Sequence, residues 1–263
     1  MSHTLMRGGL CLGLYRTEAV VLRARELGET DRLLVVYTRS EGKVRAVAKG
    51  VRRPGSRLAG LEPFTLTELQ LFRGRELDRV IQSQPRRGFR PLREDLGRLA
   101  AASYLAEVVE GITAERDASP AFFQTLVAGM ALLAQGSDPL LALRFLELRL
   151  SALAGFEPVL DRCARCGGEA GPRPAFAPAE GGLVCAGCRP ASGAFSLAPG
   201  TLASLRFLAG AEPGRVEVLR LAAGARAEMA RALVGWISYH LERRPRSLDF
   251  LEAVHLDAPR GLC

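Results

Sequence analysis

Four cysteines in the middle of the chain have the spacing of a metal site. Cys163 and Cys166 form one Cys-x-x-Cys pair, and Cys185 and Cys188 form a second pair after an interval of eighteen residues. Two such pairs are typical of a tetrahedral structural zinc site, in which no coordination position stays open for a catalytic water. The sequence therefore predicts one structural Zn²⁺ bound by these four thiolates.

Two alternative interpretations of the cysteines fit the sequence less well. A pair of disulfides requires an oxidising compartment, and the sequence shows no export signal. A redox-active Cys-x-x-Cys requires one pair rather than two. Gly187, inside the second pair, is expected to adopt a positive φ that turns backbone N–H groups toward the sulfur atoms.

Positive charge is concentrated in the amino-terminal part of the chain. Residues 1–98 carry 20 Lys and Arg against 11 Asp and Glu, a balance of +9, whereas residues 99–263 carry 16 against 17, a balance of −1. This asymmetry indicates an anionic partner for the first segment. A solubilising, arginine-rich surface is the alternative, but it does not explain why the excess lies at one end.

The densest part of this charge lies on one predicted strand and the loop after it. Alternation along a strand places Lys43, Arg45 and Lys49 on one face, and the following loop adds three arginines. Phosphates would complement this surface, although a solvated sheet edge would have a similar composition. We predict a nucleic-acid-binding surface, called the basic surface below. It is formed by Arg32, Arg39, Lys43, Arg45, Lys49, Arg52, Arg53, Arg57, Arg73 and Arg75.

Three aromatic side chains near this surface, Tyr37, Phe64 and Phe72, could stack on bases. Because only alternate positions of a barrel strand point outward, core packing is the favoured interpretation for them. The sequence leaves both roles open.

The sequence contains no recognisable catalytic constellation. The segment Gly50–Ser56 has two glycines at the spacing of a phosphate-binding loop, but serine stands where that loop needs lysine. His3, His240 and His255 have no nucleophile at a suggestive spacing, and His240 is expected at the surface or at a helix cap. We therefore expect a binding protein rather than an enzyme.

The elements that would position these residues begin with five short strands. Runs rich in Val, Leu, Phe and Thr are separated by turn sequences such as Ser40-Glu41-Gly42 and Pro54-Gly55-Ser56. Five strands in so few residues favour a small closed barrel of the OB type, with an SH3-like barrel as the main competitor. The predicted strands are Tyr15–Arg25, Arg32–Arg39, Lys43–Val51, Phe64–Phe72 and Leu77–Gln84.

After Pro91 the apolar residues recur with helical periodicity. Ser119-Pro120 and Asp138-Pro139 each place a capping side chain before a proline at the first helical position. The helix after Asp138 is apolar on most faces, which predicts a central position in a bundle. Near the start of the first helix, Glu94 and Asp95 are explained by the helix dipole better than by Mg²⁺ binding. The expected helices are Leu92–Ile112, 120–136, Leu140–Leu153, one ending at Ala209, and Val218–Leu241.

Several of these motifs together resemble the bacterial recombination mediator family RecO. Seven N-terminal runs carry the resemblance, three of them the short runs Val20–Leu22, Tyr37-Thr38 and Glu41-Gly42, together with the closing stretch Tyr239–Leu248 and the two cysteine pairs. The likeness covers nearly the whole chain. The four longer N-terminal runs are Leu27-Gly-Glu29-Thr-Asp31-Arg-Leu33, Val47-Ala-Lys49-Gly50, Arg52-Arg-Pro-Gly-Ser56-Arg57 and Leu61-Glu-Pro63-Phe64.

The resemblance implies an α+β protein of two domains. A five-stranded OB-fold at residues 15–88 would bind DNA, and an all-helical domain at residues 89–263 would carry the four-cysteine zinc finger as an insertion at about 157–195. Residues 1–14 are expected to form a flexible lead that is longer than the family usually has.

The resemblance also implies a function and its partners. Members of the family bind single- and double-stranded DNA and anneal complementary strands. They contact the tail of single-strand-binding protein and, with RecR, help load RecA onto DNA. We expect this chain to do the same in the cytoplasm, where it would associate with the nucleoid and not with a membrane. The tail would need a hydrophobic groove with basic rims, for which Arg144, Arg149 and Arg206 are candidates.

Two other classes of protein share part of this pattern. A zinc-ribbon protein that binds RNA or the ribosome would have the same cysteines and charge. A zinc-stabilised protein–protein adaptor would leave the basic surface solvated. A preference for structured RNA would favour the first class, and partner binding that is insensitive to salt would favour the second.

Overall fold

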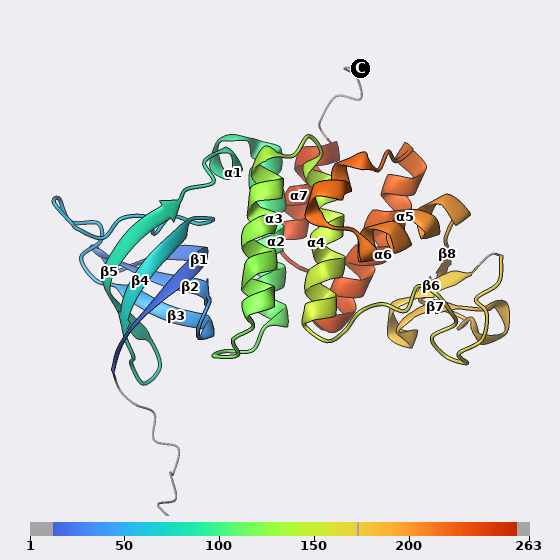
Figure 1. Cartoon of the computed structure of the whole chain (residues 1–263), viewed down its shortest axis with the longest axis horizontal. Helices are drawn as coiled ribbons and strands as arrows, with labels where there is room; N and C mark the ends of the chain where they lie inside the picture. The colour runs from blue at the N-terminus through green and yellow to red at the C-terminus, as the bar shows by residue number, and fades with distance from the viewer. Residues whose placement is uncertain (1–12, 173, 257–263) are drawn as a thin grey trace, which may run out of the picture. The chain divides into compact units, whose positions relative to one another are not determined.

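The structure is a computed structural model that describes residues 13–172 and 174–256, apart from the side chains of the last two. The chain divides into two compact units, with the boundary between Gly88 and Phe89. The first consists of strands and the second is mainly helical (Figure 1). Among the described residues, none of the helices has the length and apolar content that crossing a lipid bilayer requires.

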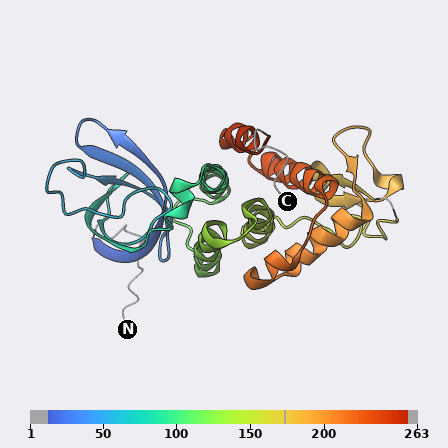
Figure 2. The same ribbon diagram turned by 90° about the horizontal axis from the view of Figure 1, so that it is seen from above.

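The first unit is a closed barrel of five strands. The strands follow one another around the barrel in the order β1-β2-β3-β5-β4, and β4 pairs with β1 to close it. In the view of Figure 2 the strands curve around one another to form the barrel. This order is that of an OB-fold, as predicted. The bounds are β1 Leu14–Leu27, β2 Asp31–Thr38, β3 Gly42–Ala48, β4 Leu66–Phe72 and β5 Asp78–Arg87.

Alternation along the strands builds the core of the barrel. On β3, Val44, Ala46 and Ala48 are buried, while Lys43 and Arg45, which alternate with them, are not. The buried side chains meet aliphatic residues of the other strands in one cluster. Burial of this cluster stabilises the barrel in proportion to the apolar area removed from water, and the outward face of β3 stays available for a ligand.

Several strand ends differ from the prediction: β1 runs on to Leu27 and β5 to Arg87, and Leu14 belongs to β1 rather than to the expected lead. The strand β3 ends at Ala48 instead of Val51, because Gly50 adopts a φ of 64° in a turn. The strand β4 begins at Leu66 because Phe64, with a φ of 64°, cannot continue a strand. Residues 1–12 of the predicted lead lie outside the described residues.

The second unit contains seven helices within its described part. Ser119 and Asp138 cap α3 and α4 through hydrogen bonds from the N–H groups of Phe122 and Leu141, which confirms both predicted caps. Buried residues lie on every side of α4, consistent with its central position. The bounds are α1 Pro91–Glu94, α2 Leu96–Ile112, α3 Pro120–Gln135, α4 Pro139–Leu153, α5 Pro199–Gly210, α6 Ala223–His240 and α7 Ser247–Leu256.

Three helical features differ from the prediction. The first helix breaks at Asp95, whose extended backbone ends α1 and whose carboxylate caps α2 by accepting from the Arg98 N–H at 2.8 Å. The helix α6 begins at Ala223 rather than Val218, after a 3-10 turn at Pro213–Val218. The helix α7 was not predicted, because its first turn is capped by Glu107 of α2, which is remote in sequence.

The cysteine segment forms a small irregular module between α4 and α5. Its three-stranded sheet has the order β7-β6-β8, with β6 at Ala175–Ala177, β7 at Gly182–Val184 and β8 at Phe195–Ser196. Two 3-10 turns lie at Pro178–Glu180 and Ala186–Cys188. The residues of β6 and β7 are buried, but the core cluster around the cysteines is small, with Ala175, Ala177 and Val184 beside Cys163. A sheet of such short strands depends on further interactions for its order.

Candidate metal centre and nucleic-acid interface

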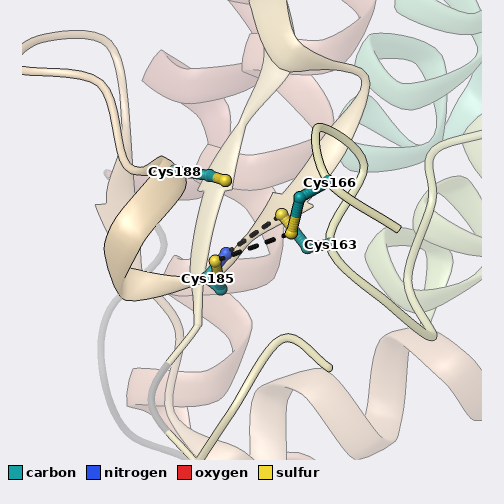
Figure 3. Close-up of side chains that lie close together, drawn as sticks. All are labelled: Cys163, Cys166, Cys185 and Cys188. Atoms are coloured by element: carbon teal, nitrogen blue, oxygen red, sulfur yellow. Dashed lines mark hydrogen bonds between the residues drawn. The ribbon is translucent and has the colours of Figure 1, made fainter. Parts of the chain in front are cut away.

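The four predicted cysteine ligands converge on one point. Cys163 and Cys166 come from the loop before β6, and Cys185 and Cys188 come from the turn after β7 (Figure 3). Their four sulfur atoms all lie within 4.8 Å of one another, and those of Cys166 and Cys185 are 4.0 Å apart. Tetrahedral coordination with metal–sulfur bonds of about 2.3 Å sets sulfur–sulfur distances of about 3.8 Å. The cysteines are therefore positioned to bind one metal ion.

Local backbone geometry places the first pair. Gly167 has a φ of 74°, which closes a tight turn through hydrogen bonds from its N–H to the Cys163 carbonyl and from the Cys163 N–H to Gly168. The Cys185 N–H donates to the Cys163 sulfur at 3.4 Å. A turn whose N–H groups face a sulfur atom stabilises a thiolate there. The positive φ expected at Gly187 is wrong, because Gly187 lies in a 3-10 turn with right-handed geometry.

The pKa values of two thiols in this cluster, Cys163 and Cys188, are shifted in opposite directions. Hydrogen bonds from the N–H groups of Cys166 and Cys185 lower the pKa of Cys163 to about 6. Hydrogen bonds with Cys185 and Cys166 raise the pKa of Cys188 to about 12. Adjacent groups that exchange hydrogen bonds divide their protons in this way. Cys163 is thus the member of the set whose thiolate the surrounding backbone stabilises most directly.

The module is attached to the helical unit by aromatic packing. Phe176 of β6 lies edge-on to Trp236 of α6, with ring centroids 6.1 Å apart. The indole N–H of Trp236 donates to the Phe156 carbonyl at 3.1 Å. The His240 ring packs against Phe156 and Trp236, so His240 belongs to this aromatic cluster rather than to an exposed cap. Burial lowers the pKa of His240.

The ten predicted basic residues all lie in the barrel unit, and none of them is buried. Strand register separates them into two groups at opposite ends of β2 and β3, with Arg45 between the groups. Lys43 and Lys49 are six positions apart on β3 and its continuation, which at about 3.3 Å per residue is about 20 Å. One group consists of Arg32, Lys49, Arg52, Arg53 and Arg57; the other consists of Arg39, Lys43, Arg73 and Arg75.

The first group is held in place by the β1–β2 turn. The Asp31 carboxylate accepts a hydrogen bond from the Gly50 N–H at 2.8 Å, and the Arg52 N–H donates to the Thr30 carbonyl at 3.0 Å. The Arg52 guanidinium lies 3.0 Å from the Glu26 carboxylate. The Gly50 hydrogen bond, followed by that from Thr30, lowers the pKa of Asp31. We call residues 49–57 the basic loop; its position is fixed by these contacts.

The second group is partly engaged in ion pairs. Arg39 contacts Glu18 at 2.7 Å, and Arg73 pairs with Glu41 of the β2–β3 turn while its guanidinium lies 5.2 Å from the centre of the Tyr15 ring. Exposed ion pairs of this kind contribute little to stability. A phosphate could therefore replace the Glu18 carboxylate as the partner of Arg39. Arg73 is less exposed and has a larger share in holding the barrel turns together.

The three aromatic candidates divide between the two roles left open. Tyr37 and Phe64 are buried, with exposed fractions of 1% and 4%, and therefore are not available to bases. Phe72 is 45% exposed and lies next to Arg73 at the end of β4. Core packing, the favoured interpretation, thus holds for two of the three.

Sequence reasoning did not locate a groove in the helical unit. This apolar groove, with a volume of about 380 Å³, is bordered by α4, α6 and α7. Arg226 and Arg144 are the basic residues among those lining it. Of the other two arginines suggested from sequence, Arg149 and Arg206 donate to the carbonyls of Ala209 and Leu160. The apolar wall consists mainly of Leu140, Leu141, Met229, Val234, Leu248 and Leu251.

Arg144 is the unusual member of this groove because it is almost wholly buried. Its Nη1 lies 3.0 Å from Oε2 of Glu147, but the two groups do not have hydrogen-bond geometry. The other Glu147 oxygen accepts a hydrogen bond from Tyr104 at 2.7 Å. Burial raises the pKa of Glu147, and Arg144 offsets part of this effect. A buried donor without an acceptor costs free energy, so Arg144 is held in the core at an energetic cost.

Comparison with known protein families decides which family this fold and these sites represent. The family model "Recombination protein O N terminal" matches residues 12–89, and "Recombination protein O C terminal" matches residues 93–249. The chain belongs to the RecO family. The two matched ranges meet near the boundary between the barrel and the helical unit.

Curated relatives cover nearly the whole chain. "DNA repair protein RecO" of Pelotomaculum thermopropionicum is 41% identical over 251 residues, which is 94% of this chain and 97% of the relative. Proteins with the same name from Desulforudis audaxviator and a Nocardioides species are each 40% identical, over 93% and 91% of this chain and 98% and 99% of the relative. The chain thus belongs to a family of DNA repair proteins and aligns with nearly the whole length of these relatives.

Proposed function

We propose that this RecO-family protein binds single- and double-stranded DNA without sequence specificity and anneals complementary strands. The observation that carries the proposal is the cationic surface on β3 and the basic loop, which the Asp31–Gly50 hydrogen bond holds in a defined position. In OB-folds the face of strands 2 and 3, with the loops beside it, is a common site for oligonucleotides.

The arrangement of charge supports binding through phosphates rather than through bases. Arginine and lysine side chains contact phosphates without reading the sequence, and their neutralisation of phosphate charge releases counterions. Tyr37 and Phe64 are buried, so base stacking has little part in binding at this face. Strands held by their backbones keep their bases free to pair, which is the requirement for annealing.

We also propose that the metal is Zn²⁺ and that its role is structural. Four thiolates saturate a tetrahedral ion and leave no position for substrate. The residues that would hold it are Cys163, Cys166, Cys185 and Cys188. When bound, the ion would connect the loop before β6 to the turn after β7 and so order a module with little apolar core of its own. In this proposal the protein is a mediator and not an enzyme.

The apolar groove of the helical unit is proposed to bind the tail of single-strand-binding protein, which is acidic and apolar. Leucines of α4 and α7 would accept the apolar side chains. Arg144, which also lines the groove, would add to the positive field that attracts carboxylates of the tail. Arg226 at the rim would attract the acidic residues, since its present ion pair with Asp138 is partly exposed.

Family membership supports a proposal for the remaining partners. RecR would act together with this protein. The two would help to load RecA onto DNA that is coated with single-strand-binding protein. These activities place the protein in the cytoplasm at the nucleoid. An RNA-directed function shares the charge and cysteines, but the curated relatives are named as DNA repair proteins.

A strand-annealing assay with and without single-strand-binding protein tests this function. Two complementary oligonucleotides, one labelled with a donor dye and the other with an acceptor, report pairing by energy transfer. The proposal predicts faster annealing with the protein, both on naked strands and on strands coated with single-strand-binding protein. No acceleration on naked strands, or tighter binding of structured RNA than of single-stranded DNA in competition, would overturn it.

A further inference from the structure

A second groove crosses the barrel on strands that the basic surface does not use. It has a volume of about 460 Å³ and lies over β5, β4 and β1. The strand register places Arg16 of β1 beside Gln70 of β4, and Gln70 beside Gln82 of β5. Gln70 alternates with the buried residues Leu69 and Leu71, so its amide points outward. We call this the amide groove, lined principally by Arg16, Gln70, Gln82 and Gln84.

The amide groove is continuous with residues of the basic surface at both ends. Arg57 of the basic loop lines one end, and the Ala59 N–H donates to the Ser83 hydroxyl at 2.9 Å, which holds this segment on β5. At the other end an adjoining hollow of about 280 Å³ shares Arg16 and Glu68 and reaches Arg39. The path from Arg57 to Arg39 therefore passes around the barrel through β5, β4 and β1.

Arginines exceed carboxylates along this path. Glu68 lies between two guanidiniums, with Arg16 at 3.0 Å and Arg86 as its second partner. The other carboxylate, Glu18, is paired with Arg39. Arg57 adds a fourth positive charge, so four arginines face two glutamates. The local field is therefore positive, but weaker than that of the basic surface, and a phosphate backbone would be attracted without being held tightly.

Glutamine amides give this groove a different chemistry from that of the basic surface. Each amide offers donors and an acceptor, which can bond to sugars, phosphates or base edges of any sequence. A path across β5, β4 and β1 to the end of β2 spans three strand spacings of about 4.8 Å. At about 3.4 Å per stacked nucleotide, this path of about 14 Å holds about four nucleotides.

We propose that the amide groove binds the second single strand of DNA during annealing. This inference rests on the proposed function, because it assumes that a first DNA strand is bound at β3 and the basic loop. The amide groove would then hold the complementary strand. The two sites share Arg57 and Arg39 as end points, so two strands would lie on one barrel with their ends close together. Loose binding at the amide groove allows its strand to be released once pairing has formed.

A charge-change variant separates this site from the basic surface. Gln70→Glu with Gln82→Glu adds two negative charges at outward strand positions without changing side-chain size. Gln124→Glu with Gln135→Glu is the matched control, because both glutamines are exposed on α3. Each full-length protein is tested with naked oligonucleotides for affinity toward one labelled strand and for the rate of annealing two strands. Thermal melting verifies that each variant is folded.

The proposal predicts that the groove variant anneals about tenfold more slowly while its affinity for one strand changes by less than about twofold. The α3 control should match the unmodified protein in both measurements. Unchanged annealing in the groove variant would overturn this inference and leave the proposed function intact. An equal loss of single-strand affinity and annealing would also overturn it, since the groove would then be part of one binding surface. Failure of the unmodified protein to anneal would instead contradict the proposed function.

Discussion

The Asp31 carboxylate accepts a hydrogen bond from the Gly50 N–H at 2.8 Å, and this contact joins the β1–β2 turn to the basic loop. The two residues belong to separate sequence runs that carry the family resemblance. Gly50 has a φ of 64°, a conformation that favours glycine, and its N–H consequently points at the carboxylate. An acidic residue thus helps to hold a cationic surface in place.

Replacement of Asp31 by alanine should weaken DNA binding several-fold, because the basic loop loses its anchor. Replacement by asparagine keeps the oxygen acceptor and removes only the charge near Lys49 and Arg53, so Asp31→Asn should bind DNA at least as tightly as the unmodified protein. Fluorescence anisotropy with a labelled single strand measures both variants. If Asp31→Ala also binds more tightly, then Asp31 acts only through its charge.

Glu107 of α2 should contribute to the acid sensitivity of the helical unit. Partial burial acts to raise its pKa, but hydrogen bonds from the Ser247 hydroxyl and N–H, the Arg243 guanidinium and the Arg246 N–H outweigh burial and lower the pKa from 4.5 to about 2. Because the folded-state pKa lies below the ordinary value, the carboxylate stabilises the fold above pH 4.5. This contribution is lost as the pH falls toward 2.

Glu107→Gln should therefore lower the free energy of unfolding at pH 7 by about 1–2 kcal/mol, allowing for solvent screening. The deficit relative to the unmodified protein should shrink as the pH is lowered through 4.5. Urea unfolding at a series of pH values measures it. A deficit that stays constant over that range would show that the Glu107 carboxylate does not stabilise α7 through its charge.

Removal of the metal should destabilise the cysteine module more than it weakens DNA binding. Cys163 is the ligand whose sulfur accepts the Cys185 N–H, and Cys163→Ser replaces the thiolate by a weaker zinc ligand. We expect one zinc per unmodified chain by elemental analysis, less in the variant, and a lower melting temperature. DNA affinity per folded molecule should be nearly unchanged. Absence of bound metal in the unmodified protein, with the same melting temperature for both, would contradict a structural zinc site.

The apolar groove predicts a selective loss of partner binding. Ala227 of α6 lines the groove and is exposed, so Ala227→Glu places a negative charge beside the proposed path of the acidic tail without entering the core. Its matched control is Ala203→Glu on α5, also exposed and outside the groove. Affinity for a peptide copy of the tail should fall about tenfold only in Ala227→Glu. Equal affinities for the peptide would place the tail elsewhere.

The features that sequence could predict are those written in local patterns. Alternation on β3 and the capping residues Ser119 and Asp138 gave correct elements because each signal lies within a few residues. The cysteine spacing placed four sulfurs together because two tight turns need no distant partner to form. Local sequence is sufficient wherever the backbone geometry is set by neighbouring residues.

The features that sequence missed depend on contacts between distant segments. The cap of α7 comes from Glu107, which is 140 residues from Ser247. The anchor of the basic loop is Asp31, and the groove at Arg144 exists only after α4, α6 and α7 have packed. Of these features, only Asp31 could have been found from the sequence, because it lies in one of the runs that resemble the family. Nothing in the local sequence marks Glu107 as a cap or Arg144 as part of a groove.

The salt dependence of single-strand binding tests the central claim most directly. In the variant with Lys43→Glu, Arg45→Glu, Arg52→Glu and Arg53→Glu, the plot of log affinity against log salt concentration should become less steep by at least about 2, because up to four phosphate contacts are removed. Affinity at low salt should fall by roughly a hundredfold or more, with the melting temperature nearly unchanged. The same slope and affinity in a folded variant would contradict the claim that this surface binds DNA.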